Sequence, residues 1–202
     1  MASRDDEMRD FLYRAGIESG AVDSALEIDA VMQQWRRRFR KRELGASALR
    51  DLKLDDRLDL AQLDVLIAIW APSKEFTCKA GQETMVATVA ERLAIDPSRA
   101  SRLISDLIAR GLARRAVSQQ DARRTIVELT EGGKAIVRAV RRYKFLLMGD
   151  FLSGWTPEER ATFLPLLDRF SKWTDEAPNM ASDHFVEEIA ALVAALPPVD
   201  GG

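Results

Sequence analysis

The chain has 202 residues, of which 47% are hydrophobic and 31% are charged, a composition typical of soluble globular proteins rich in helix. Its net charge is −2, so the charge of the whole chain favours neither nucleic acid nor membrane as a partner. We expect no membrane span, because no uncharged apolar run is long enough, and no secretory signal, because charges fill the first twenty positions. The single cysteine excludes an intrachain disulfide, and the single histidine, His184, leaves too few ligands for a zinc site. A cytoplasmic protein without membrane contact, metal or cofactor is predicted.

The first third of the chain predicts two helices. Residues 1–18 are charged and weakly patterned, and we expect a flexible or partner-docked arm there. From about Val22 to Arg42, apolar residues recur at three- and four-residue steps, which predicts an amphipathic helix. Residues 43–58 hold Gly45 and several acids and are predicted to be a connection. A second helix begins at Asp59, which has the spacing of a capping box.

The middle of the chain predicts two short helices followed by a hairpin. After a loop at residues 71–83, a helix is expected over about Val86–Leu93. Asp96 and Pro97 then form a strong helix start, and Gly111 stands where a left-handed C-terminal residue is expected. Two strands are predicted next, at about 112–117 and 125–129. This order is that of a winged helix-turn-helix.

The last third predicts long helices again. One is expected over 134–152, after two adjacent glycines, and another begins at Thr156 with a complete start signature. The second continues to about Trp173, and a short amphipathic helix follows around 185–193. The predicted fold is therefore mainly α with a small β-hairpin wing, in which N- and C-terminal dimerisation helices flank a winged helix-turn-helix domain.

The helix that begins at Pro97 has one apolar side and one polar side without an acid. Its polar side consists of Ser98, Arg99, Ser101, Arg102 and Ser105. Short hydroxyls allow a helix to lie close to a sugar-phosphate wall, and arginine binds phosphates or guanine edges. Residues 97–124 contain seven arginines and two acids, a net charge of +5, so the rest of the chain carries −7. A positive face on an acidic body is typical of a DNA-binding domain. The alternative is an amphipathic helix beside a solvated hairpin.

The segment Thr88–Gly133, TVAERLAIDPSRASRLISDLIARGLARRAVSQQDARRTIVELTEGG, resembles the MarR family of bacterial transcription regulators. The most specific element is the Asp121-x-Arg123 pattern followed by LTEGG, and the resemblance covers about residues 25–175. It implies that Arg123 enters the minor groove of double-stranded DNA and that Asp121 braces it. Arg124 stands where many family members have a small residue, and a phosphate contact is one role open to it.

The resemblance also implies a homodimer with interdigitated terminal helices. The expected organisation has five parts: a flexible arm (1–18), an N-terminal dimerisation helix and connection (19–58), the winged helix-turn-helix (59–132), C-terminal dimerisation helices (133–175) and a C-terminal extension (176–202). Dimerisation also follows from geometry, because one recognition helix contacts few base pairs and specific binding usually needs two half-sites about one helical turn apart.

Several features leave alternatives open. The basic run Arg36–Arg42 is a solvated or cap-like helix end, a nucleic-acid contact or an anion subsite. The family commonly binds a small aromatic or phenolic effector. Trp35, Phe39 and Trp70 are candidates to line such a site, and core packing explains these aromatics equally well.

The resemblance therefore implies a transcriptional repressor that binds a pseudo-palindrome and is released by such an effector. Two alternatives are a redox sensor acting through Cys78 and a winged-helix module that binds protein. No enzyme is expected, because the chain has no Gly-rich phosphate loop and no nucleophile–histidine pair.

Overall fold

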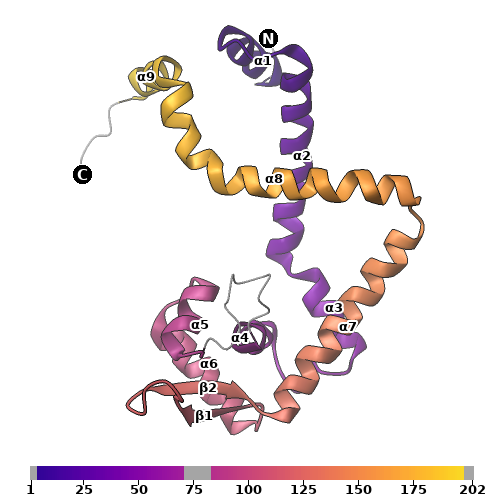
Figure 1. Cartoon of the computed structure of the whole chain (residues 1–202), viewed down its shortest axis with the longest axis vertical. Coiled ribbons are helices and arrows are strands. Elements are labelled where there is room, and N and C mark those ends of the chain that lie inside the picture. Colours follow the sequence, from indigo (N-terminus) through magenta and orange to yellow (C-terminus); the bar gives the residue numbers. More distant parts are fainter. Residues whose placement is uncertain (1–3, 71–82, 198–202) are drawn as a thin grey trace. The chain divides into compact units, whose positions relative to one another are not determined.

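A computed structural model describes residues 4–70 and 83–197, with the side chains of residues 39–40 and 178–183 outside the described part. The chain divides into two compact units, one formed by Met1–Arg40 with Leu152–Gly202 and the other by Lys41–Phe151. Among the described residues, helices dominate and one antiparallel strand pair lies in the second unit, which confirms the predicted fold class (Figure 1). None of the helices in these ranges combines the length and the apolar character that a membrane crossing requires.

The first unit begins with α1 (Arg4–Arg14) and α2 (Ser19–Lys41). Most of residues 1–18, where an arm was predicted, is helical. Acids occupy the first turn of α1 and Arg14 its last turn, an arrangement that the helix dipole favours. Nε of Arg9 also donates to Asp23 of α2 at 3.1 Å. The Glu18 carboxylate caps α2 by accepting from the amides of Gly20 and Ala21, which lowers its pKa.

The rest of the first unit consists of α8 (Pro157–His184) and α9 (Val186–Ala195). The predicted start of α8 is confirmed, since Thr156 and Glu159 exchange hydrogen bonds of 2.7 and 3.1 Å. The helix continues well past Trp173, where we expected it to end. The segment after Trp173 lacks an apolar period, and sequence periodicity therefore missed it.

The second unit begins with α3 (Glu43–Asp51), where we expected only a connection. This helix forms because Ala48 and Leu49 are buried in the core, a long-range contact that the local sequence does not reveal. Arg42 precedes it with a left-handed backbone (φ 53°), and its guanidinium pairs with Asp64 and donates to the Leu60 carbonyl at 3.2 Å. At least this end of the basic run therefore has a structural role.

The predicted helix at Asp59 is α4 (Leu60–Trp70). The capping box is confirmed: the Asp59 amide donates to Gln62 Oε1 at 3.0 Å, and the Gln62 amide donates to Asp59 Oδ1 at 2.8 Å. Residues 71–82, which include the predicted loop, Pro72 and Cys78, lie outside the described residues.

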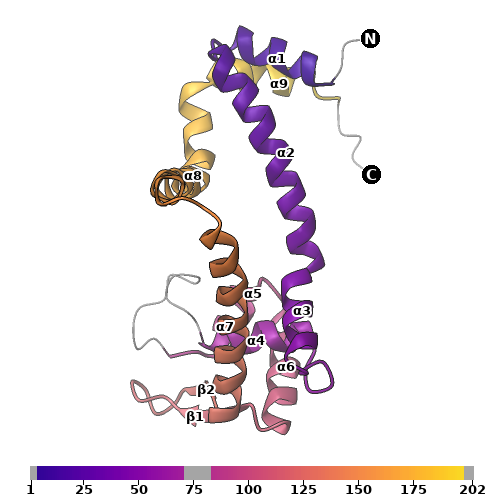
Figure 2. The same ribbon diagram turned by 90° about the vertical axis from the view of Figure 1, so that its right-hand side faces the viewer.

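The helix-turn-helix and wing follow the prediction closely. They comprise α5 (Val86–Leu93), α6 (Pro97–Ala109), β1 (Ala113–Val117) and β2 (Thr125–Leu129), which pairs antiparallel to β1 with Ala113 opposite Leu129. Gly111 has φ +70°, as a left-handed residue after α6 requires. In Figure 2 the β1–β2 hairpin extends away from α7 of the same unit.

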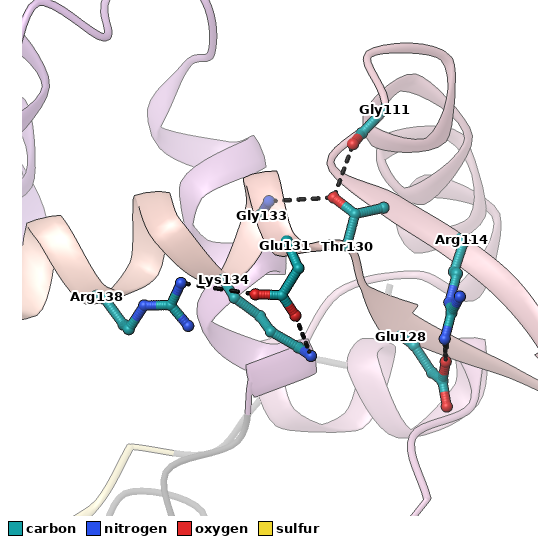
Figure 3. Close-up of polar contacts among 8 residues, drawn as sticks. All are labelled: Gly111, Arg114, Glu128, Thr130, Glu131, Gly133, Lys134 and Arg138. Atoms are coloured by element: carbon teal, nitrogen blue, oxygen red, sulfur yellow. Dashed lines mark hydrogen bonds and ion pairs between the residues drawn. The ribbon is translucent and has the colours of Figure 1, made fainter.

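Helix α7 (Glu131–Ser153) begins three residues earlier than predicted, so both glycines lie in its first turn. The reason is Thr130, whose Oγ1 accepts from the Gly133 amide at 3.2 Å and donates to the Gly111 carbonyl at 2.7 Å (Figure 3). Gly133 is buried, and a Cβ there would overlap the Leu112 carbonyl oxygen. Glycine is therefore required at this position by close packing of α7 on the residue that precedes β1.

One hydrophobic core joins the elements of the second unit. Its fully buried side chains include Val65, Leu66, Val89, Ile104, Leu107 and Val137. Residues of α3 and of α7 (Ile136, Val137 and Val140) belong to the same core. The compact unit is therefore wider than the expected domain of residues 59–132, because apolar surface from both flanking helices is needed to close it.

Candidate nucleic-acid interface

The turn between α5 and α6 is short. Ala94 ends α5 with a left-handed backbone (φ 48°), and the Ile95 amide donates to the Ala90 carbonyl at 3.0 Å. Ala90 is 4% exposed, and its small side chain suits the close crossing of the two helices. This turn fixes the direction in which α6 leaves the core.

Asp96 caps the N-terminus of α6. Its carboxylate accepts from the Ser98 hydroxyl at 2.5 Å, from the Ser98 amide at 2.8 Å and from the Arg99 amide at 3.3 Å. These hydrogen bonds, led by that from the Ser98 hydroxyl, hold the pKa of Asp96 below its ordinary value. Pro97 has the fixed φ that suits the first helical position. Helix α6 therefore starts with the Asp96 cap and Pro97 at its first position, as predicted.

Helix α6 has one buried side and one exposed side. Ala100, Ile104 and Leu107 are each 0% exposed, and they fix the rotation of the helix about its axis. As a consequence, Ser98, Arg99, Arg102 and Ser105 are exposed, whereas Ser101 is half-buried. The predicted side chains thus do form one outward face. The exposed Asp106 lies one helical turn after Arg102 on the same side, so the expectation of a polar side without an acid is wrong.

The hydroxyls of this face have internal partners. Ser98 donates to Asp96, and Ser105 donates to the Ser101 carbonyl at 2.9 Å. Over the described residues, by contrast, the guanidinium groups of Arg99 and Arg102 form no hydrogen bond or ion pair. The two arginines are the side chains of this face that remain available to an external anion.

The wing turn, residues 118–124, is closed without glycine. The Ser118 amide donates to the Arg124 carbonyl at 3.0 Å, and the Arg124 amide donates to the Asp121 carbonyl at 2.9 Å. Inside the turn, the Ser118 hydroxyl oxygen accepts from the amides of Gln120 and Asp121 at 3.1 and 3.0 Å. Ser118 is 4% exposed. Hydrogen bonds to a buried hydroxyl therefore hold this turn, whereas tighter hairpins rely on the positive φ of glycine.

The arginines at the tip have different surroundings. Asp121 Oδ2 lies 3.2 Å from Nε of Arg124, and Asp121 Oδ1 accepts from the backbone amide of Arg123 at 3.0 Å. The aspartate thus orients the backbone of Arg123, while its ion pair is with Arg124. Within the described part of the chain, the exposed Arg123 guanidinium has no hydrogen bond or ion pair.

Glu83 is a residue of this region that our sequence analysis missed. Its Oε2 accepts from the Ser118 hydroxyl at 2.5 Å, and its Oε1 accepts from the Gln119 amide at 2.6 Å. These contacts, led by the Ser118 hydrogen bond and assisted by the charge of Arg124, lower the pKa of Glu83. No local pattern marks this residue, because its partners lie 35 and 36 positions later in the chain.

A second connection joins the wing to the helices. The Val127 amide of β2 donates to the Thr84 carbonyl at 2.8 Å. Arg92, in the last turn of α5, donates to the Thr84 hydroxyl at 3.1 Å and to the Ala68 carbonyl of α4 at 2.7 Å. Residues 83 and 84 therefore link the wing to both α4 and α5.

The base of the wing contains compensated charges (Figure 3). Arg114 of β1 donates to Glu128 of β2 at 3.0 and 2.8 Å, and Glu131 pairs with Lys134 at 2.8 Å and with Arg138 at 3.8 Å. Arg110 donates to the Arg57 carbonyl at 2.5 Å. Two of the seven arginines counted in residues 97–124, Arg110 and Arg114, therefore have partners within the protein.

The residues predicted to line an effector site lie in different units. Trp35 of α2, 41% exposed, belongs to the first unit, and Trp70 at the end of α4 is packed against the core of the second. The side chain of Phe39 and all of Cys78 lie outside the described part. Trp70 lines a hollow of about 430 Å³ whose polar walls include Arg114, Glu128 and Lys134.

Comparisons with known proteins agree with this geometry. Residues 77–124 match the MarR family. The fold is similar to that of a MarR family protein from Bacillus stearothermophilus (15% identity, 76% of this chain, 96% of that chain, TM-score 0.60). It is also similar to Streptococcus pneumoniae FabT in complex with DNA (16% identity, 76% and 99%, TM-score 0.56) and to RV1404 from Mycobacterium tuberculosis (18% identity, 73% and 94%, TM-score 0.55). No curated protein matches the chain in sequence.

Proposed function

We propose that this chain is a DNA-binding transcription regulator of the MarR type, a dimeric repressor that binds a pseudo-palindromic operator. The match of residues 77–124 to the MarR family and the similarity of the fold to that of a MarR family protein support this proposal. Helix α6 enters the major groove, and the wing enters the adjacent minor groove. The observation that carries this proposal is that four of the seven arginines of residues 97–124 are exposed and have no hydrogen bond or ion pair within the described chain. They are Arg99 and Arg102 on α6, Arg115 on β1 and Arg123 on the wing turn. Arg110, Arg114 and Arg124 have internal partners.

The contacts proposed for the two elements differ in kind. Arg99 and Arg102 extend from the exposed side of a helix whose first turn is rigidly capped, which suits contacts to phosphates and to guanine edges. Arg123 extends from a turn that is closed by internal hydrogen bonds, which suits insertion into a narrow minor groove of high negative potential. Arg124, already paired with Asp121, holds the turn and adds positive charge near a phosphate.

A homodimer is supported by the apolar surface of the first unit. In α8, Leu166 and Trp173 are 48% and 50% exposed, and in α9 Val186 and Val193 are 60% and 62% exposed. Apolar patches of this kind are seldom left in contact with water by a soluble monomer. We propose that a second copy of the chain covers this surface, since a two-fold dimer also supplies the second recognition helix for the other half-site.

We further propose that a small aromatic acid or phenol releases the protein from DNA. The hollow beside Trp70 offers an aromatic wall, and Arg114 and Lys134 line it as members of ion pairs with Glu128 and Glu131. Such a ligand would act by favouring a spacing of the two recognition helices that does not match the operator. In this mechanism the ligand binds the DNA-free form more tightly than the DNA-bound form.

The decisive experiment is selection of bound duplexes from a random DNA pool with the full-length protein. We expect enrichment of an inverted repeat whose half-sites lie about one helical turn apart. The selected duplex then serves as the probe for a screen of aromatic acids and phenols. Failure to enrich any sequence would contradict the proposal, and enrichment of single half-sites would contradict the dimeric mode of binding.

A further inference from the structure

We propose that Glu83 is a positioning residue that holds the wing turn, through Ser118, in the conformation that presents Arg123. This inference rests on the proposed function for its consequence in DNA binding. The contact itself is a property of the protein alone and can be tested without DNA.

The wing turn has little intrinsic reason to hold one conformation. Seven residues, 118–124, connect β1 to β2, and they include no glycine. Within the described chain, backbones of positive φ occur elsewhere and at none of these seven positions. The left-handed residues that define the tightest hairpins are thus missing from this connection. Longer loops of ordinary residues rely on side-chain hydrogen bonds for a fixed conformation.

Glu83 completes the set of hydrogen bonds that closes the turn. The Ser118 hydroxyl oxygen accepts two amides of the turn, and its proton is donated to Glu83. The same carboxylate accepts from the amide of Gln119 through its other oxygen. One ionised side chain thus engages the first two residues of the turn from outside the hairpin. Hydrogen bonds to a charged acceptor are stronger than those between neutral groups.

Glu83 is itself anchored to the helices. The next residue, Thr84, is 5% exposed, accepts from Val127 of β2 and is hydrogen-bonded to Arg92 of α5. Hydrogen bonds of Glu83 and Thr84 therefore connect the turn to the helix-turn-helix, in addition to its connection to its own strands. These contacts fix the position of Arg123 relative to α6. Simultaneous binding of α6 in the major groove and of the wing in the minor groove depends on that relative position.

Removal of the Glu83 charge distinguishes two possible effects of this residue on DNA binding, positioning of the wing and electrostatic repulsion of phosphates. An acid next to a DNA-contacting wing repels phosphates, so its removal should tighten DNA binding if charge alone mattered. If Glu83 positions the wing, its removal should weaken binding instead. The two explanations predict changes of opposite sign.

The test compares Glu83→Gln with Glu128→Gln. Both substitutions remove one negative charge from the wing region, but the Glu128 carboxylate pairs with Arg114 and not with the turn. On the selected operator we expect Glu83→Gln to lose about tenfold in affinity, since a charge-assisted hydrogen bond is lost. Glu128→Gln should bind as tightly as the wild type or more tightly. In an Arg123→Ala background, Glu83→Gln should have no further effect, because its action passes through that arginine.

Amide hydrogen exchange on the free protein provides the independent measurement. We expect faster exchange at Gln119, Gln120 and Asp121 in Glu83→Gln and in Ser118→Ala, with the Val127 amide unchanged. Unchanged exchange at the turn, or an affinity that equals or exceeds that of the wild type, would overturn the inference. If the wild type selects no DNA, the proposed function fails, and the exchange result alone then decides whether Glu83 holds the wing.

Discussion

The Asp121 carboxylate pairs with the guanidinium of Arg124, at 3.2 Å, and reaches Arg123 only through its backbone amide, at 3.0 Å. Two adjacent arginines of the wing therefore have different roles. Arg124 belongs to the internal structure of the turn, and the Arg123 side chain extends from a backbone that Asp121 holds. This division is the basis of the first prediction.

Arg123→Ala should weaken binding to the selected operator by about 1–3 kcal/mol, the range expected for a specific arginine contact in a groove. A gel-shift titration measures the change, and sedimentation should show the oligomeric state unaltered. Arg124→Ala is the matched comparison, because it removes the same charge one position later. Equal losses for the two variants would mean that the wing contributes only general positive charge.

The α6 arginines should contribute to the salt dependence of binding. Each phosphate neutralised adds about 0.9 to the slope of log affinity against log salt concentration. We expect the Arg99→Ala, Arg102→Ala double variant to lower that slope by roughly 1–2, according to how many of the two guanidinium groups contact phosphates. Affinity measured over a range of salt concentrations gives the slope. A flat dependence in the wild type would contradict phosphate contacts altogether.

The two glycines at the start of α7 should respond oppositely to alanine. At Gly133 a Cβ would overlap the Leu112 carbonyl oxygen, so Gly133→Ala should destabilise the fold by about 1–3 kcal/mol or more. At Gly132 the nearest atoms to a Cβ lie at 3.6 Å or beyond, and Gly132→Ala should be neutral or stabilise by up to about 1 kcal/mol. Urea unfolding monitored by circular dichroism measures both. Similar effects for the pair would show that helix propensity, and not the close contact, decides.

The cap at Asp96 should make stability depend on pH. Because hydrogen bonds from Ser98 and Arg99 hold its folded-state pKa below 3.8, the contribution is fully present above that value and is lost as the pH falls through the lower, folded-state pKa. Asp96→Ala should therefore be clearly less stable than the wild type at pH 7, with the difference shrinking below pH 3.8. Urea midpoints at a series of pH values provide the measurement.

The control for this cap is Asp106→Ala, at an exposed aspartate later in the same helix. Its effect should be small and should change little over the same pH range. A difference between Asp96→Ala and the wild type that persists unchanged at low pH would rule out an ionised cap.

The apolar face of α8 should control dimerisation. Leu166→Glu places a charge in surface that the proposed dimer buries, so we expect a shift toward monomer in sedimentation equilibrium. Ala161→Glu introduces the same charge at an exposed position on the opposite side of the same helix and should leave the dimer intact. A monomeric wild type, or a Leu166→Glu variant that dimerises normally, would contradict this assignment of the interface.

Features that depend on contacts between residues close in sequence were predicted correctly, and features that depend on distant contacts were missed. The Asp59–Gln62 and Thr156–Glu159 capping boxes and the Asp96–Pro97 start were predicted correctly, since each depends on residues within a few positions of one another. Helix α3 was missed because it is stabilised by burial of Ala48 and Leu49 against distant elements. The outward face of α6 followed from helical periodicity, whereas the internal partners of its serines did not.

The amino-acid sequence by itself determined the order of helices and hairpin, the two sides of α6 and the concentration of arginines in residues 97–124. These properties depend on periodicity, capping and composition, which are local. Only the tertiary structure decided which arginines are available to a partner, because Arg110, Arg114 and Arg124 find acceptors that lie elsewhere on the hairpin or across the fold. It also brought Glu83 to Ser118, since a hydrogen bond between residues 35 positions apart exists only once the chain has folded around its core.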